Sequence, residues 1–205
     1  MPVDPLVLLA FIPAAFALNL TPGADMMFCL GQGLRHGPRA AMSANLGIGI
    51  ASFLQTLAAG LGLGALVAAQ PWAFDVIRWI GVAYLVWLAI NALRAGPVSA
   101  NSPESNRAFR DAFIVNLTNP KVILFVLAFV PQFVDPSRGS VLLQFAIFGA
   151  IMFVGGLIVN GAVGLFAGGI GRRLASSPGF ARVLGYISAG VYGALALRLA
   201  VMEKS

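Results

Sequence analysis

Two stretches of this chain, residues 40–74 and 139–171, contain no charged residue at all. Each is much longer than the roughly 20 apolar residues that cross the hydrocarbon core of a bilayer as a helix. The composition agrees with membrane insertion, because 59% of the residues are hydrophobic and only 10% are charged, against about 25% charged in a typical soluble domain. The sequence therefore predicts an all-α integral membrane protein rather than a soluble one.

Charged and Pro/Gly-rich stretches divide the chain into apolar segments long enough to be transmembrane helices. Six such segments cover approximately residues 5–34, 40–69, 72–94, 111–134, 141–170 and 180–201. The start of the chain lacks the positively charged region that precedes a cleaved secretory signal. We therefore expect the first segment to remain as a spanning helix, which gives six transmembrane helices in a single membrane domain, residues 1–205.

The two halves of the sequence resemble each other. The motif Asn-Leu-Thr occurs at residues 19–21, directly before Pro22-Gly23, and again at residues 116–118, directly before Asn119-Pro120. We expect repeat one at residues 1–96, a connecting loop at 97–110 and repeat two at 111–205. Because each half contains three segments, the second half must enter the membrane from the opposite side, so the prediction is two inverted three-helix repeats.

Both copies of the motif place a proline inside an apolar segment. Proline has no N–H, and a freed backbone carbonyl is costly in lipid unless protein or water satisfies it. Helices 1 and 4 are therefore predicted to be broken, and paired breaks in corresponding halves of a membrane protein indicate a binding site. The candidate substrate-binding or coupling residues are Asn19, Thr21, Pro22, Gly23, Asp25, Asn116, Thr118, Asn119, Pro120 and Lys121.

Asp25 and Lys121 are the charged residues that remain when the loops and helix ends are set aside. Each follows one of the breaks, and a charge at bilayer depth costs about 3 kcal/mol on insertion scales. Two structural alternatives stay open: an ion pair that only pins the halves together, or an Asp25 solvated in an interfacial loop. In the functional interpretation, helix N-termini suit a carboxylate, while unwound carbonyls and Asp25 suit an ammonium, so the site fits a zwitterion. Asp25 could also take up and release a proton as its surroundings alternate.

Other polar residues lie at bilayer depth, and they either line a cavity or form hydrogen bonds between helices. They are Asn45, Gln55, Thr56 and Asn160. Two small-residue pairs, Gly60-x3-Gly64 and Gly164-x3-Gly168, predict close helix packing within the chain or in a homo-oligomer.

The basic residues predict the orientation. With the N-terminus outside, eight fall on the inner side and four on the outer side, which favours both termini outside. The inner set is Arg35, Arg39, Arg94, Arg107, Arg110, Arg172, Arg173 and Arg182, and the outer set is Arg78, Arg138, Arg198 and Lys204. The net charge of +6 is thus explained by topology, and no soluble basic domain exists to bind nucleic acid.

The sequence disfavours an enzyme. A single cysteine, Cys29, and a single histidine, His36, offer neither a disulfide nor a metal cluster, and Asp25 has no second intramembrane carboxylate. Hydrolytic chemistry needs a nucleophile with a base, a metal or a carboxylate pair, so we expect no cofactor and no metal. The paired helix breaks favour a transporter. The alternative is a passive small-solute channel or a non-catalytic membrane subunit. A channel would need a continuous polar stripe, which the sparse polar residues do not form.

Several motifs together resemble one family over nearly the whole chain. They are Thr-Pro-Gly-Ala-Asp at residues 21–25, Gly-Val-Ala-Tyr-Leu at 81–85, the run from Phe113 to Lys121 that ends in Asn-Pro-Lys, and Pro-Gln-Phe-Val at 131–134. In this respect the chain is similar to the LysE/RhtB-type amino-acid exporters, although Ala24 stands where the family usually has a second proline.

The resemblance implies a secondary exporter of amino acids or related metabolites in the bacterial inner membrane, working by proton antiport. It implies that Pro22, Gly23 and Asp25 form one functional element, and that Asn119, Pro120 and Lys121 form the other. The partners that it implies are a small zwitterionic substrate, protons and the lipid bilayer.

Overall fold

The computed structural model describes residues 1–69, 72–94, 107–167 and 177–201. This part of the chain contains eight α-helices and no strand. They are α1 (Pro5–Leu20), α2 (Ala24–His36), α3 (Pro38–Ala69), α4 (Trp72–Arg94), α5 (Ala108–Leu117), α6 (Pro120–Leu124), α7 (Val141–Leu165) and α9 (Pro178–Val201). Most of the expected connecting loop, residues 97–110, lies outside the described residues, as does Gly168.

Three of these helices are long and apolar enough to cross a membrane: residues 38–62 within α3, residues 141–165 of α7 and residues 178–197 within α9. The pair α1 and α2 and the pair formed by α5 with residues 120–133 each meet the same test jointly, which gives up to five spans. The described apolar part of α4, Val82–Arg94, is shorter. The all-helical membrane fold is confirmed, while the sixth span stays a prediction.

Both predicted helix breaks are present. The axes of α1 and α2 differ by 54°, and those of α5 and the helix that begins at Pro120 differ by 50°. At the second break, Pro120 is the first residue of α6 and the Asn119 side chain caps that helix by accepting a hydrogen bond from the Lys121 N–H at 3.1 Å. Proline at the first position costs no hydrogen bond within α6 itself, which explains why the chain restarts there.

Beyond Leu124 the helix changes its winding. Residues Phe125–Phe129 form a π-helical turn, and Val130–Phe133 form a 3-10 turn. A π-helical turn is rare and frequently lies near a functional site. Here it follows directly on the break at Pro120.

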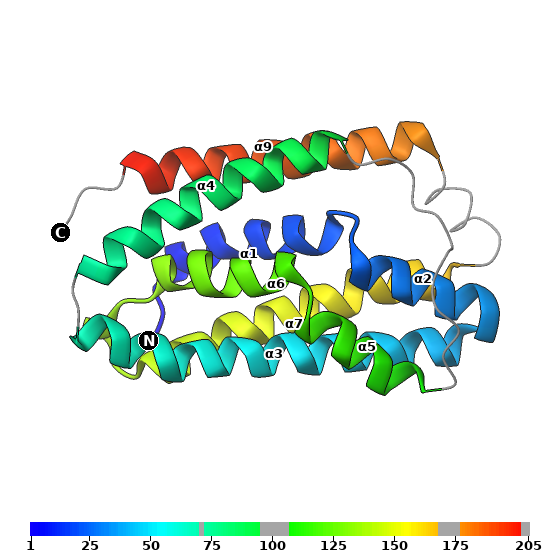
Figure 1. Cartoon of the computed structure of the whole chain (residues 1–205), viewed down its shortest axis with the longest axis horizontal. Helices are drawn as coiled ribbons and strands as arrows, with labels where there is room; N and C mark the ends of the chain where they lie inside the picture. Colours follow the sequence, from blue (N-terminus) through cyan, green and yellow to red (C-terminus); the bar gives the residue numbers. More distant parts are fainter. Residues whose placement is uncertain (70–71, 95–106, 168–176, 202–205) are drawn as a thin grey trace.

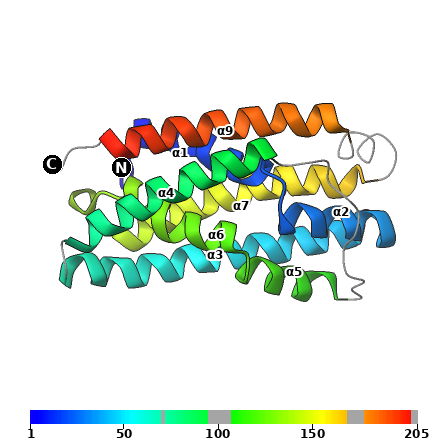
Figure 2. The ribbon, with the colours of Figure 1, turned by 45° about the horizontal axis from the view of Figure 1, so that its top comes forward.

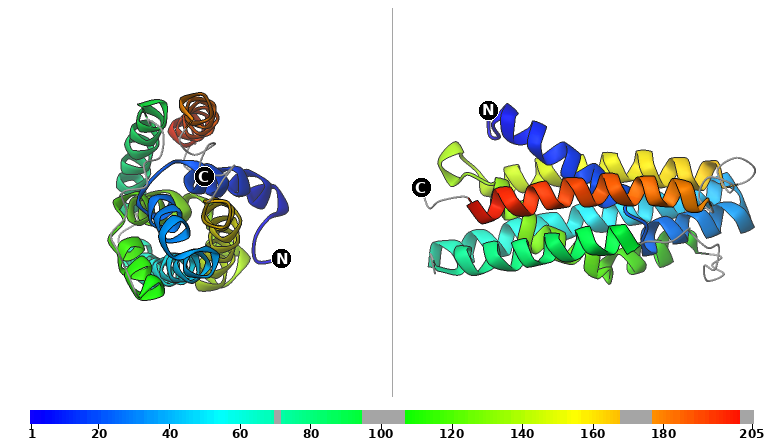
Figure 3. Two further views of the ribbon diagram at one scale, coloured as in Figure 1. Left: turned by 90° about the vertical axis from the view of Figure 1, so that its right-hand side faces the viewer. Right: turned by 90° about the horizontal axis from the view of Figure 1, so that it is seen from above.

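The helices are arranged as a bundle with a separate outer pair (Figure 1). Helices α3 and α7 pack along each other, and α4 packs against α9. The end-on view in Figure 3 shows α4 and α9 side by side, apart from most of the bundle. In Figures 1 and 2, α3 runs in the opposite direction to α7, and α4 in the opposite direction to α9. The start of α1 and the end of α9 lie at the same end of the molecule.

Glycines permit the closest helix contacts. A Cβ on Gly33 of α2 would lie 2.2 Å from the Gly164 carbonyl oxygen of α7, which no side chain could occupy. Gly60 of α3 faces the Phe145 side chain of α7, where a Cβ would lie 2.8 Å away. The predicted packing role of Gly60 and Gly164 within the chain is therefore confirmed.

Five phenylalanine rings fill the core between the start of α1 and the π-helical segment. Phe11 of α1 lies at its centre, with ring centroids 4.5 Å from Phe148 and 5.2 Å from Phe133. Phe125 and Phe129 complete the cluster, and their centroids lie 4.7 Å apart. Tilted and edge-on contacts of this kind are favourable beyond the apolar area that they bury. The cluster joins α1, α7 and the helix after Pro120.

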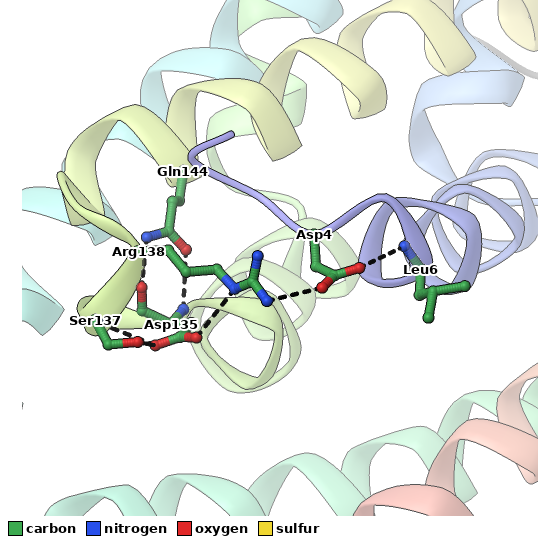
Figure 4. Close-up of polar contacts among 6 residues, drawn as sticks. All are labelled: Asp4, Leu6, Asp135, Ser137, Arg138 and Gln144. Atoms are coloured by element: carbon green, nitrogen blue, oxygen red, sulfur yellow. Dashed lines mark hydrogen bonds and ion pairs between the residues drawn. The ribbon is translucent and has the colours of Figure 1, made fainter.

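Near this cluster, a polar network connects the start of α1 to the loop before α7 (Figure 4). Arg138 donates to Asp4 at 2.8 Å and pairs with Asp135 at 3.3 Å. Asp135 also accepts hydrogen bonds from the Ser137 hydroxyl and backbone N–H, which hold the pKa of this loop carboxyl below its ordinary value. Gln144 of α7 accepts from the Asp135 N–H and donates to its carbonyl, so the loop is fixed to α7.

Candidate functional site

The two helix breaks meet through the side chain of Lys121. Its ammonium nitrogen Nζ donates to the carbonyl oxygens of Leu18 and Thr21, each at 2.9 Å. Leu18 lies in the last turn of α1 and Thr21 directly follows that helix, whereas Lys121 lies at the start of α6. A single charged side chain of the second half therefore holds the break of the first half.

Pro22 explains why these carbonyls are available. In a continuous helix, the Leu18 carbonyl would accept from the N–H of residue 22, but proline has none. The Thr21 carbonyl lies beyond the last turn of α1 and before the first turn of α2, so it has no helical partner. Since the negative end of a helix dipole attracts cations, the ammonium of Lys121 suits this position electrostatically.

At the second break, a proline again frees the carbonyl four residues earlier, but a different side chain donates to that carbonyl. Pro120 removes the N–H that would pair with the Asn116 carbonyl, the residue four positions earlier. That carbonyl instead accepts from the Gln55 amide of α3 and from the Asn119 backbone N–H, both at 3.0 Å. In each half, therefore, a polar side chain from another helix satisfies the carbonyl that proline has freed.

Asp25 connects the first turn of α2 to the second break. One carboxylate oxygen, Oδ2, accepts from the side-chain amides of Asn116 at 3.1 Å and Asn119 at 3.0 Å. The other oxygen, Oδ1, is buried and has no hydrogen-bond partner among the described residues. Asp25 is only 6% exposed, so it does not lie in a solvated loop. Nor does it form a direct ion pair with Lys121, whose ammonium is bound to carbonyls.

Two tyrosines complete the network. Tyr84 of α4 donates to the Lys121 carbonyl at 2.6 Å, and the hydroxyl of Tyr192 of α9 lies 3.0 Å from the Thr21 hydroxyl. The sequence predicts neither of them as a site residue. The signal available there was a phenol in an apolar helix, because a buried tyrosine hydroxyl usually has a hydrogen-bond partner.

The structure brings most of the predicted residues together. Thr21, Gly23, Asp25, Asn116, Asn119 and Lys121 lie in or against this network, with Pro22 and Pro120 causing the two breaks. Asn19 points to α7, where its amide lies 3.4 Å from the Met152 carbonyl. Thr118 lies outside the network, because it is exposed and its hydroxyl donates to the Ile114 carbonyl of its own helix.

Of the other polar residues at bilayer depth, Gln55 and Asn45 connect helices. Asn45 of α3 donates to the Leu157 carbonyl of α7 at 3.0 Å. Thr56 donates to the Ser52 carbonyl within α3. The amide oxygen of Asn160 in α7 is buried and has no partner among the described residues.

The face of α2 that carries Asp25 continues toward the end of that helix. Residues 25, 29 and 32 share this face by helical spacing. Cys29 is fully buried, and Gln32 is buried with neither side-chain polar atom partnered in the described part of the chain. His36 is exposed at the end of α2. No cluster of three metal-ligating side chains occurs among the residues that the structure describes.

Fold and site together define a multi-pass helical membrane protein with a buried polar site where two broken helices meet. Residues 16–203 match the family described as LysE type translocator. The chain belongs to this family. Its members are transporters and not enzymes.

Three relatives illustrate the range of the family. The chain is 34% identical to the homoserine/homoserine lactone efflux protein of Salmonella typhimurium over 73% of its own length and 75% of the relative's. It is 28% identical to the leucine efflux protein of an Enterobacter species, over 81% and 93% of the two chains. It is 42% identical to an uncharacterized membrane protein of Vibrio cholerae over 64% and 67%. No solved structure matches the chain.

Proposed function

We propose that this protein is a secondary active exporter of amino acids or related small zwitterionic metabolites, driven by proton antiport. Family membership supports export, and the names of two relatives supply the substrate class, since they are efflux proteins for homoserine, its lactone and leucine. The observation that carries the proposal is the pair of opposite charges, Asp25 and Lys121, at the meeting point of the two breaks.

The unused hydrogen-bonding capacity of this pair fits a zwitterion. Oδ1 of Asp25 is a buried acceptor without a partner in the described part of the chain, suited to the ammonium group of an amino acid. Lys121 has three N–H donors, of which two bind the Leu18 and Thr21 carbonyls. The third suits the substrate carboxylate. Substrate would thus bind between the acid of one half and the amine of the other.

Asp25 is also the proposed proton carrier. A carboxyl group that is alternately buried and open to water can be neutral in one state and ionised in the other. The amides of Asn116 and Asn119 hold one of its oxygens in either state, because a protonated carboxyl group still has an acceptor oxygen. Proton entry and substrate exit would then use the same side chain in turn.

The proposed topology is six spans in two inverted repeats, in the bacterial inner membrane with both termini outside. It is supported by the antiparallel course of α3 against α7 and of α4 against α9, as expected for corresponding helices of inverted halves. An even number of crossings also agrees with the start of α1 and the end of α9 lying at the same end of the bundle.

Reconstituted vesicles test the proposal. Purified protein should give saturable uptake of radiolabelled leucine or homoserine that depends on a pH gradient across the vesicle membrane. Conductance that does not saturate with substrate would instead indicate a passive channel.

Asp25→Asn tests the role of the carboxylate. An asparagine keeps an oxygen that can accept from Asn116 and Asn119, so the variant should insert and fold. We expect transport to fall at least about tenfold, because a hydrogen bond to a charged group is worth about 1.5–3 kcal/mol and 1.4 kcal/mol corresponds to a factor of ten. Asp4→Asn is the matched control, since asparagine also caps helices. Unchanged proton coupling in Asp25→Asn would contradict the assignment.

A further inference from the structure

The carbonyl end of α1 has the chemistry of a cation site. It presents the carbonyl oxygens of Leu18 and Thr21, which bind the Lys121 ammonium, at the negative end of a helix dipole and inside a predominantly apolar bundle. In ion-coupled transporters with broken helices, unwound carbonyls and half-helix C-terminal ends coordinate the coupling cation. In this protein the same position is filled by an ammonium group that belongs to the chain.

The surroundings of the Lys121 ammonium are those of a specific cation site and not of a chance contact. Both donor–acceptor distances are 2.9 Å, as expected for charge-assisted hydrogen bonds. A Cβ on Gly23 would lie only 3.1 Å from Nζ, so the absence of a side chain there makes room for the ammonium. Asp25 supplies negative charge nearby without contacting it directly.

We propose that Lys121 is a tethered cation: its ammonium fills a site for a monovalent cation, built by the Leu18 and Thr21 carbonyls at the α1 break. This inference rests on the proposed transport function and adds to it which cation occupies the α1 break. The chain carries its own cation on α6, so this position needs no sodium ion. The break in α1 can open only when α6 withdraws the ammonium, which couples the two halves.

Removing the side chain should create an empty site for a free cation. Lys121→Ala should transport at least about tenfold less than the natural protein, because it loses two hydrogen bonds from a charged donor. Ethylammonium should restore much of that transport, since it brings back both the charge and the N–H donors. Tetramethylammonium has the charge without a donor, and it should not restore transport.

Lys121→Met is the matched control. Its unbranched side chain fills most of the space that lysine occupied and carries no charge, so it should be impaired and should not respond to ethylammonium. Full-length protein in vesicles, assayed by exchange of radiolabelled leucine without a pH gradient, gives the transport measurement.

Thermal unfolding in detergent gives a measurement independent of transport. Ethylammonium should raise the unfolding temperature of Lys121→Ala in a concentration-dependent manner, because a ligand that binds only the folded state stabilises it. The unfolding temperature of Lys121→Met should not change. If Lys121→Ala folds only when ethylammonium is present during purification, the cation site is supported as well.

Three results would overturn the inference: full transport by Lys121→Ala without added amine, equal responses of Lys121→Ala and Lys121→Met, or a Lys121→Ala protein that stays unfolded with ethylammonium while Lys121→Met folds. Absence of transport by the natural protein would contradict the proposed function instead. The thermal measurement would still decide whether the cation site exists.

Discussion

At the scale of single residues, two prolines account for much of the site. Pro22 frees the Leu18 carbonyl and Pro120 frees the Asn116 carbonyl, each four residues earlier in the chain. In lipid such a carbonyl needs an internal partner, and the structure supplies Lys121 in one case and Gln55 in the other. Lys121 and Gln55 therefore supply the hydrogen bonds that the two interrupted helices cannot supply themselves.

Tyr84→Phe is expected to loosen the second break. The change removes the hydrogen bond to the Lys121 carbonyl, but that carbonyl keeps the backbone N–H of Phe125. The loss should therefore be about 0.5–1.5 kcal/mol, seen as a fall of a few degrees in the unfolding temperature in detergent. Tyr186→Phe is the control, because that side chain is 62% exposed. An equal effect of both changes would argue against a specific role for Tyr84.

At the scale of helices, the sequence predicted where the helices lie along the chain better than it predicted which residues of different helices are in contact. The expected segments 72–94 and 180–201 agree closely with α4 and α9, because long apolar runs bounded by charge are a strong signal. The segment expected at 111–134 begins earlier, at Ala108, and contains a π-helical turn that no local pattern indicated. The end of the fifth segment, expected at residue 170, lies outside the described residues.

The candidate site was predictable only in part, for a physical reason. Proline marks its own break, and a charge in an apolar segment is costly, so the sequence points to Asp25 and Lys121 as candidates. The partners of the freed carbonyls depend on how distant helices pack, which a single sequence does not encode locally. The sequence carries no local pattern that predicts the contacts of Tyr84 and Tyr192, and Thr118 belongs to the repeated motif without joining the network.

Gly33→Ala is expected to separate α2 from α7. The new Cβ would lie 2.2 Å from the Gly164 carbonyl oxygen and 2.7 Å from the Ala167 side chain, so one helix has to move. Overpacking of this kind costs about 1–3 kcal/mol, measurable as a lower unfolding temperature and a smaller folded yield. Gly62→Ala serves as the control, since a Cβ there meets no atom of the described residues within 4 Å. A fully stable Gly33→Ala protein would show that α2 packs differently.

At the scale of the whole molecule, opposite ends carry different features. The end where α1 begins holds the phenylalanine cluster and the Asp4–Arg138–Asp135 network, while the other end holds the exposed Arg35 and His36. With the proposed orientation, the aromatic cluster lies between the site and the outside.

Cysteine labelling of intact cells tests this orientation. Ser137→Cys should react with a membrane-impermeant maleimide, because the residue is exposed at the end proposed to be outside. His36→Cys should react only after the cells are opened. The natural protein serves as the background, since its single cysteine, Cys29, is buried. The reverse pattern would place both termini in the cytoplasm.

The pairing of α4 with α9 has a mechanical consequence. These two helices pack against each other, and each sends one hydroxyl group to a break in the opposite half of the chain, Tyr84 to the carbonyl of Lys121 and Tyr192 to Thr21. If α4 and α9 move together as one rigid pair, the hydrogen bonds of Tyr84 and Tyr192 act on both helix breaks at the same time. The two breaks then change conformation together and not independently of each other.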